Sequence, residues 1–201
     1  MNIKKLLLSR TRIAKQKVYP WRAREKHYAG SLFDRFRGLQ PLFDRAQGST
    51  VLDVGSSDGL ISYEFARRGS TLIHGLELDP FSVQFSKYLF REIPIDHLFL
   101  ETDLALGVRS TSLPSQTSGN LCEKYDIVLF LGVYHHLLNQ VSKEEAGEIV
   151  RHFANLARGF FAVRTNTMSP VDDIVRNMGF ELCSTSPAHS NVGLLHIYQS
   201  S

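Results

Sequence analysis

The feature that most limits the possible folds of this sequence is a regular alternation of short apolar runs and helical segments from residue 50 onward. The apolar runs have the length and the Val, Ile, Leu and Phe content of buried strands, and amphipathic segments separate them. Such alternation predicts a parallel sheet whose crossover helices cover both faces. The expected strands are Thr50–Val54, Thr71–Glu77, His97–Glu101, Tyr125–Leu131 and Gly159–Arg164, and the expected helices are Leu60–Arg68, Pro80–Arg91, Lys143–Leu156 and Val171–Met178.

The last two apolar runs, Phe180–Ser184 and Gly193–Tyr198, follow each other without a helix between them. Consecutive strands that lack a crossover pair in the antiparallel direction. We therefore expect an α/β, Rossmann-like fold with a seven-stranded, mostly parallel sheet. A C-terminal antiparallel hairpin should form its edge, and helices should lie on both faces.

A charge asymmetry separates the N-terminal segment from the rest of the chain. Residues 1–45 contain twelve Lys and Arg against three acidic residues, whereas residues 46–201 contain eleven against seventeen. We interpret residues 1–45 as a basic helical arm and residues 46–201 as one domain. The positive charge suits an anionic partner such as phosphate, nucleic acid or a membrane surface, and it equally suits an arm folded over an acidic body. A transit peptide or an interfacial helix over Met1–Lys17 is a weaker interpretation.

Cysteine content and apolar run length favour a cytoplasmic protein. Cys122 and Cys183 lie far apart without a CxxC spacing, which is typical of reduced thiols. The longest apolar run, Ile127–Val133, is much shorter than the ~20 residues that a membrane span needs.

The end of the first expected strand carries a motif for cofactor binding, in the run Val51–Gly59. Small residues there let the chain turn sharply, so that the next helix presents its N-terminal amides to a ligand. A dinucleotide fingerprint, G-x-G-x-x-G, would need glycine at Gly55, Ser57 and Leu60, and only the first is present. The pattern acid-x-G-x-G-x-G instead falls on Asp53, Gly55, Ser57 and Gly59. In this pattern the run resembles class I S-adenosylmethionine-dependent methyltransferases.

Ser57 is the one departure from that pattern, since it stands where the family has its middle glycine. A serine is accommodated there if its φ stays negative, but it narrows the space beside the methionine tail of the cofactor. The departure also supports a rival interpretation, in which the chain is a non-catalytic methyltransferase-like subunit that binds a partner. An NAD-dependent oxidoreductase is a further alternative, and the missing glycines count against it.

The resemblance extends to the ends of the second and third strands. Glu77 corresponds to the acid that binds the ribose hydroxyls, while Asp79 before Pro80 has the features of a helix N-cap. Asp103 resembles the acid that receives the adenine amino group, and a capping aspartate is the alternative. The implied cofactor is S-adenosylmethionine, with S-adenosylhomocysteine as product. The residues expected to hold it are Asp53, Gly55, Ser56, Ser57, Gly59, Glu77, Leu78, Asp103, Leu104 and Gly132.

The fourth strand and the residues after it, Tyr125–Leu137, give a second family signal. They resemble the F-D-x-V-x-x-x-x-V-x-x-H-L segment of class I enzymes that methylate oxygen, and they are similar to tRNA wobble-uridine carboxymethyl transferases and some glycan methyltransferases. No D/N-P-P-Y/F motif for amine methylation and no Pro-Cys nucleophile is present. Because Gly132–Leu138 contains no carboxylate, we expect no catalytic metal.

The resemblance implies in-line transfer of a methyl group to an acceptor oxygen. A hydroxyl acceptor must lose its proton, and a histidine near the methyl group is a suitable base at neutral pH. His135 or His136 is the candidate base, with a helix cap or a core residue as the alternative for each. Tyr134 either orients the acceptor or packs on the cofactor.

The acceptor itself is the least constrained part of the prediction, and a small-molecule, glycan or RNA acceptor that carries negative charge fits the sequence. Trp21, Arg22 and Tyr28 combine aromatic rings with positive charge in the basic arm, where they either contact the acceptor or anchor the arm. Arg164, at the end of the fifth strand, either holds an acceptor phosphate or carboxylate or forms a surface ion pair. We expect the remaining wall of the acceptor site to come from the arm and from a loop over Leu104–Lys124.

Overall fold

The central strands form where the sequence supplies short, mainly apolar runs. A computed structural model of the chain describes residues 35–109, 121–188 and 193–201. Two expected strands, over residues 50–54 and 125–131, have the predicted bounds, and the others differ at their ends by a few residues. The strands are β1 (Thr50–Val54), β2 (Leu72–Glu77), β3 (Asp96–Glu101), β4 (Tyr125–Leu131), β5 (Ala157–Thr165), β6 (Phe180–Pro187) and β7 (Leu194–Ser200).

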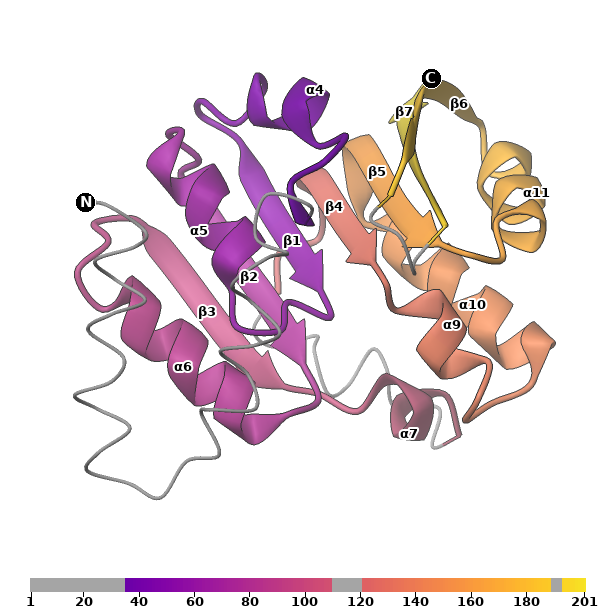
Figure 1. Cartoon of the computed structure of the whole chain (residues 1–201), viewed down its shortest axis with the longest axis horizontal. Coiled ribbons are helices and arrows are strands. Elements are labelled where there is room, and N and C mark those ends of the chain that lie inside the picture. Colours follow the sequence, from indigo (N-terminus) through magenta and orange to yellow (C-terminus); the bar gives the residue numbers. More distant parts are fainter. Residues whose placement is uncertain (1–34, 110–120, 189–192) are drawn as a thin grey trace. The chain divides into compact units, whose positions relative to one another are not determined.

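The seven strands form one sheet in the order β3-β2-β1-β4-β5-β7-β6 (Figure 1). The first five strands of this order are parallel to one another. Strand β7 lies antiparallel between β5 and β6, so that the last two strands form the hairpin at the sheet edge. The prediction of a mostly parallel seven-stranded sheet with a C-terminal antiparallel hairpin is confirmed.

The longer helices occupy the segments with helical periodicity. Two short helices, α7 and α9, were not expected; α7 lies in the segment that we predicted to be a loop over residues 104–124. The described helices are α4 (Gln40–Phe43), α5 (Leu60–Arg67), α6 (Pro80–Phe90), α7 (Leu104–Arg109), α9 (Tyr134–Leu137), α10 (Lys143–Asn155) and α11 (Ser169–Asn177).

Local capping residues define where the two longest helices begin. Asp79 caps α6 by accepting a hydrogen bond from the amide of Phe81, which confirms the predicted capping role. Ser142 and Glu145 form a reciprocal capping box at the start of α10. Both caps satisfy amides that lack a partner within the helix.

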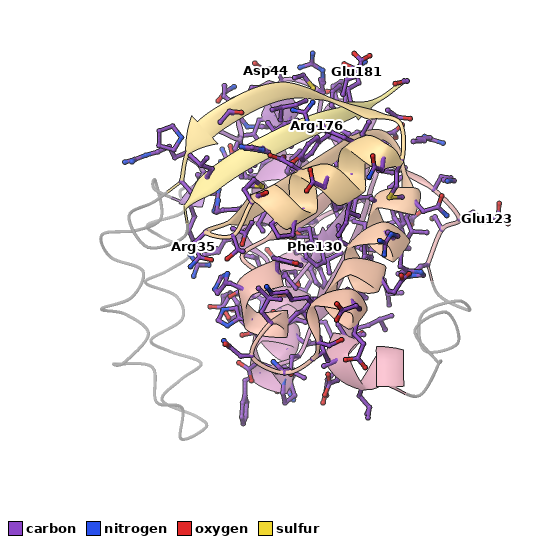
Figure 2. All side chains as sticks on the ribbon, turned by 90° about the vertical axis from the view of Figure 1, so that its right-hand side faces the viewer. Arg35, Asp44, Glu123, Phe130, Arg176 and Glu181 are labelled. Atoms are coloured by element: carbon purple, nitrogen blue, oxygen red, sulfur yellow. The ribbon has the colours of Figure 1, made fainter. Side chains whose placement is uncertain are left out.

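Helices cover both faces of the sheet. Leu52 of β1 belongs to the apolar cluster that contains Phe153 of α10, whereas its neighbour Asp53 accepts a hydrogen bond from Ser62 of α5. Successive residues of a strand point to opposite faces, so α10 and α5 lie on opposite sides of the sheet. Figure 2 shows Phe130 of β4 in the interior behind α10 and α11, where its side chain is fully buried.

Within the described ranges, no helix has both the length and the apolar character needed to cross a membrane.

Candidate functional site

The residues expected to bind the cofactor come together at the carboxyl ends of β1, β2, β3 and β4. Strand β1 has β2 on one side and β4 on the other, so the chain order reverses at β1. In open α/β sheets this switch point leaves a crevice at the carboxyl ends of the strands, where ligands bind. The topology therefore places the loop over residues 55–59 at the position of a ligand site.

The loop after β1 is held against β2 by its own backbone. The amides of Gly55 and Ser56 both donate to the carbonyl oxygen of Leu76, at 2.8 and 2.9 Å. The amide of Gly59 then donates to the carbonyl oxygen of Ser56 at 2.9 Å, which closes the turn before α5. The Ser56 hydroxyl is buried and has no hydrogen-bond partner in the described part of the chain.

Every second residue of this loop is left-handed. The φ angles are +72° at Gly55, +51° at Ser57 and +70° at Gly59. Gly55 also needs to be glycine for space, because a Cβ there would lie 2.5 Å from Cγ2 of Val133. The expectation that Ser57 fits with a negative φ is wrong, since the serine adopts the left-handed conformation that the middle glycine of the pattern would take.

Asp53, the acid of the motif, lies in the interior beneath the loop. Its side chain is 2% exposed, and its Oδ2 accepts a hydrogen bond of 2.6 Å from the Ser62 hydroxyl on α5. Burial raises the pKa of Asp53 to about 6, the hydrogen bond from Ser62 partly offsets this rise, and the negative charge of Glu77 adds to it. Because burial and Glu77 both disfavour the ionised form of Asp53, a nearby positive charge would stabilise that form.

Glu77 faces the loop from the end of β2, as the sequence predicts. Its Oε2 accepts the amide of Ser57 at 2.8 Å, and its Oε1 accepts the amide of Asp79 at 2.9 Å. A carboxylate has about four lone-pair sites, so two remain for further donors once the bonds from the described residues are counted. The next residue, Leu78, is 51% exposed, which makes it one of the few large apolar side chains at the surface of the described residues.

Asp103 follows β3 and caps α7. Its Oδ1 accepts the amides of Ala105 and Leu106 at 3.0 and 3.1 Å, so the capping role considered for it is present. Both bonds go to one oxygen, and within the described residues Oδ2 makes no hydrogen bond. Leu104 beside it is half-buried and packs against the core cluster.

The segment after β4 turns sharply into α9. Gly132 has a φ of +80°, and its amide donates to the carbonyl oxygen of Arg164 at 2.9 Å. Tyr134 is 1% exposed and belongs to the core cluster, so its ring packs in the interior. Burial raises the pKa of the Tyr134 hydroxyl.

The adjacent histidines differ in their surroundings, although their ring centroids are only 4.1 Å apart. His136 is exposed. His135 is half-buried, and its Nδ1 is buried without a hydrogen-bond partner among the described residues. Burial lowers the pKa of His135, and the neighbouring charge of His136 lowers it further. His135 therefore favours the neutral form, which can accept a proton.

Of the residues expected to contact the acceptor, the structure describes only Arg164. Trp21, Arg22 and Tyr28 lie outside the described residues. Arg164 is 4% exposed, so a surface ion pair does not describe it. Its Nη2 donates to the carbonyl oxygen of Arg37 at 3.5 Å, and its positive charge slightly lowers the pKa of Asp53.

Three serines that support the site from the helices were not predicted from the sequence. Ser82 of α6 donates to the buried carboxylate of Asp58 at 2.9 Å, and Ser86, one turn later, donates to the carbonyl oxygen of Ser57 at 3.2 Å. Two serines at i and i+4 on an otherwise apolar helix face are the signal that points to them. Ser62 shows no comparable signal in the sequence.

No family model matches the sequence, and a comparison with curated protein sequences gives no match. Comparison with solved structures does give matches. Magnesium protoporphyrin IX methyltransferase from Synechocystis PCC 6803, solved with bound S-adenosylhomocysteine, is 19% identical with a TM-score of 0.60 over 84% of this chain and 86% of that chain. A TehB-like methyltransferase from Corynebacterium glutamicum, described as dependent on S-adenosylmethionine, is 16% identical with a TM-score of 0.62 over 94% and 99%. A ribosomal protein L11 methylase from Lactobacillus delbrueckii is 15% identical with a TM-score of 0.55 over 79% and 75%.

These structures share little sequence with the chain, so the likeness concerns the fold. It agrees with the strand order β3-β2-β1-β4-β5-β7-β6 and with the antiparallel β7. The chain has the fold of the class I S-adenosylmethionine-dependent methyltransferases.

Proposed function

We propose that this chain is an S-adenosylmethionine-dependent methyltransferase that acts on an oxygen of a small-molecule, sugar or nucleotide-containing acceptor. The observation that carries the proposal is the meeting of the left-handed loop over residues 55–59 with the carboxylate of Glu77. The two amides that bind Glu77 orient its carboxylate, and its remaining lone pairs suit a pair of neighbouring hydroxyls.

The residues at the sheet edge fit each part of the cofactor. In this proposal Glu77 binds the ribose, Leu78 and Leu104 contact the adenine, and Asp103 accepts from the adenine amino group. Asp53, Gly55, Ser56, Ser57, Gly59 and Gly132 border the methionine portion. When bound, S-adenosylmethionine supplies a methyl group that its sulfonium makes electrophilic.

His135 is the better candidate for the base that takes the proton of the acceptor. Its lowered pKa keeps it neutral near pH 7, and its partial burial shields it from bulk water. His136 is exposed and adjacent to His135, and its charge lowers the pKa of His135. Tyr134 serves as packing beneath this segment.

A non-catalytic binding subunit is the second candidate, because Ser57 departs from the pattern at the loop. An NAD-dependent oxidoreductase is a third, with less support. Thermal unfolding with S-adenosylmethionine, S-adenosylhomocysteine and NAD in parallel separates them, since a ligand that binds only the folded state raises its stability by RT ln(1 + [L]/Kd). We expect stabilisation by the first two compounds and none by NAD. If neither S-adenosylmethionine nor S-adenosylhomocysteine raises the unfolding temperature, the assigned cofactor site is wrong.

Replacing Glu77 tests the ribose contact. Glu77→Ala should weaken binding of S-adenosylhomocysteine by about 1.5–3 kcal/mol, the scale of hydrogen bonds to a charged acceptor. Glu101→Ala is a matched control, because Glu101 is the exposed β3 partner of Glu77 in the sheet register. Isothermal titration should show unchanged affinity in the control. Equal affinity in both variants means that the ribose binds elsewhere.

Replacing the histidines tests the catalytic assignment. His135→Ala should lower kcat by roughly 10²- to 10⁴-fold with little change in cofactor affinity, whereas His136→Ala should change kcat little. Because protonated His135 cannot act as a base, activity of the wild type should fall as the pH drops below the lowered pKa of His135. This acidic limb should flatten in His135→Ala. If both variants retain wild-type turnover, neither histidine is the base. Catalysis then depends on holding the acceptor close to the methyl group, or on an acceptor that is already ionised.

A further inference from the structure

The loop between β1 and α5 adopts a conformation that its sequence does not favour at Ser57. Ser57 is the one non-glycine residue with a positive φ among the described residues. An L-residue is strained there because its Cβ comes close to the following carbonyl oxygen; Gly adopts this region routinely, and Asn and Asp do so occasionally. Contacts outside the residue must therefore hold it.

The hydrogen bonds that close the loop do not involve Ser57. They join Gly55 and Ser56 to Leu76, and Gly59 to Ser56. Within the described residues, the hydrogen bonds of Ser57 itself go to Glu77 and Ser86 alone: its amide donates to Glu77 Oε2 at 2.8 Å, and its carbonyl oxygen accepts from Ser86 Oγ at 3.2 Å.

Glu77 is the stronger of these two partners. A hydrogen bond to an ionised carboxylate is roughly twice as strong as one between neutral groups, and the bond to Ser57 is also the shorter. The Ser86 hydroxyl also lies 3.0 Å from the carbonyl oxygen of Ser82, so its single proton is shared between two acceptors. The second oxygen of Glu77 is fixed by the amide of Asp79.

We propose that Glu77 is a positioning residue that holds Ser57 in the left-handed conformation and so keeps the loop open for its ligand before the ligand arrives. This inference rests on the proposed function only in naming the loop as a cofactor site. It gives Glu77 a role apart from any contact with ribose. This role is needed because Ser57, unlike a glycine, does not favour the left-handed conformation. In a chain with glycine at this position, the loop would adopt the same conformation without assistance.

The amide of Gly59 provides a readout in the ligand-free protein. It bonds to Ser56 and not to Glu77, so its hydrogen-exchange rate reports the loop conformation itself. In Glu77→Ala, NMR should show exchange at Gly59 roughly 10- to 100-fold faster than in the wild type. In the double variant Ser57→Gly with Glu77→Ala, the rate should return to within about threefold of the wild type.

Two further variants keep this experiment decisive. Glu101→Ala removes the same charge from the neighbouring strand end and should leave the Gly59 rate unchanged. Glu77→Gln keeps one acceptor oxygen and should give an intermediate rate, which covers the case in which Glu77→Ala does not fold. Equal acceleration by Glu77→Ala in the Ser57 and Ser57→Gly backgrounds overturns the proposal, because it shows that Glu77 does not act through Ser57.

Ligand binding separates this inference from the proposed function. A 2′,3′-dideoxy analogue of S-adenosylhomocysteine lacks the hydroxyls that Glu77 would bind. Its affinity should fall about 3- to 10-fold in Glu77→Ala and less than twofold when Ser57→Gly is also present; equal losses in both backgrounds count against the positioning role. If S-adenosylhomocysteine itself does not bind the wild type, the proposed function fails, and the exchange rates of the ligand-free protein still decide the role of Glu77.

Discussion

Two aspartates on neighbouring central strands lie at opposite ends of the sheet and in opposite electrostatic settings. At the amino end, Asp126 of β4 accepts two hydrogen bonds from Arg158, at 2.7 and 2.9 Å, and two more from the amide and hydroxyl of Thr50, at 2.8 and 2.9 Å. These bonds, with Arg158 foremost, lower the pKa of Asp126 to about 2. At the carboxyl end, Asp53 of β1 is buried beside Ser62, whose hydroxyl donates a hydrogen bond to it, and burial raises its pKa to about 6.

The loops before and after β1 also differ, in the space around a glycine with a left-handed backbone. Gly48, before the strand, has a φ of +75° and nothing within 4 Å of the position of a Cβ. Gly55, after the strand, has a similar φ of +72°, but a Cβ there would meet Val133 at 2.5 Å. The left-handed Ser57 lies at the carboxyl end too. The amino end is thus arranged for stability, whereas unfavourable features gather where the ligand site is proposed.

The largest effect should come from placing a side chain on the crowded loop. Gly55→Ala combines an unfavourable φ with a contact against the stiff side chain of Val133, and we expect a loss of about 2–5 kcal/mol in the free energy of unfolding. Gly48→Ala has the same φ without the contact and should lose only about 1–2 kcal/mol. Urea unfolding of both variants measures the difference. Equal losses would show that the space beside Val133 is not limiting.

The next effect concerns the buried carboxylate. The pKa of Asp53 is raised from 3.8 to about 6, so the folded state binds its proton more tightly than the unfolded state. The contribution of Asp53 to stability is therefore fully present below pH 3.8 and is lost as the pH rises through about 6, with a size on the order of 3 kcal/mol.

Asp53→Asn removes this titration. Between pH 4.5 and pH 7.5, the free energy of unfolding of the wild type should fall relative to that of the variant by roughly two thirds of this amount. The pH dependence is a cleaner measure than the absolute stability, because the new amide also changes the hydrogen bonding around Ser62. Parallel pH profiles for the two proteins would mean that Asp53 is not the group that titrates.

Much of the fold follows from the sequence, because β1 and β4 are short, mainly apolar runs with clear boundaries. The sequence also indicates Asp79 as the cap of α6, and it places Glu77 at the end of the second strand, where its carboxylate accepts the amide of Ser57. The short helices α7 and α9 were missed, since six and four residues are too few to show helical periodicity.

The site is less predictable than the fold for a different reason. The bond between Glu77 and Ser57 joins residues 20 positions apart, and the bond between Ser62 and Asp53 joins residues nine apart. Such contacts depend on how the helices pack on the sheet, which local pattern does not reveal. The positive φ of Ser57 was unpredictable because serine rarely adopts it. Tertiary contacts decide the conformation there.

The smallest expected effect tests the amino end of the sheet. The lowered pKa of Asp126 means that the folded state favours its charged form, so this contribution to stability is present above pH 3.8 and is lost as the pH falls toward about 2. Arg158 is 56% exposed and Asp126 is 35% exposed, so solvent screening makes the contribution of the pair to stability small. Asp126→Ala should slightly lower the free energy of unfolding in urea at pH 7 and should lower it less at pH 2.5, which is close to the folded-state pKa, with Arg158→Ala as a parallel case that keeps the bonds to Thr50. Because the site lies at the other end of the sheet, cofactor affinity should not change in either variant. A changed affinity would show that the two ends of the sheet are energetically coupled. The assignment of stability to the amino end and of binding to the carboxyl end would then be wrong.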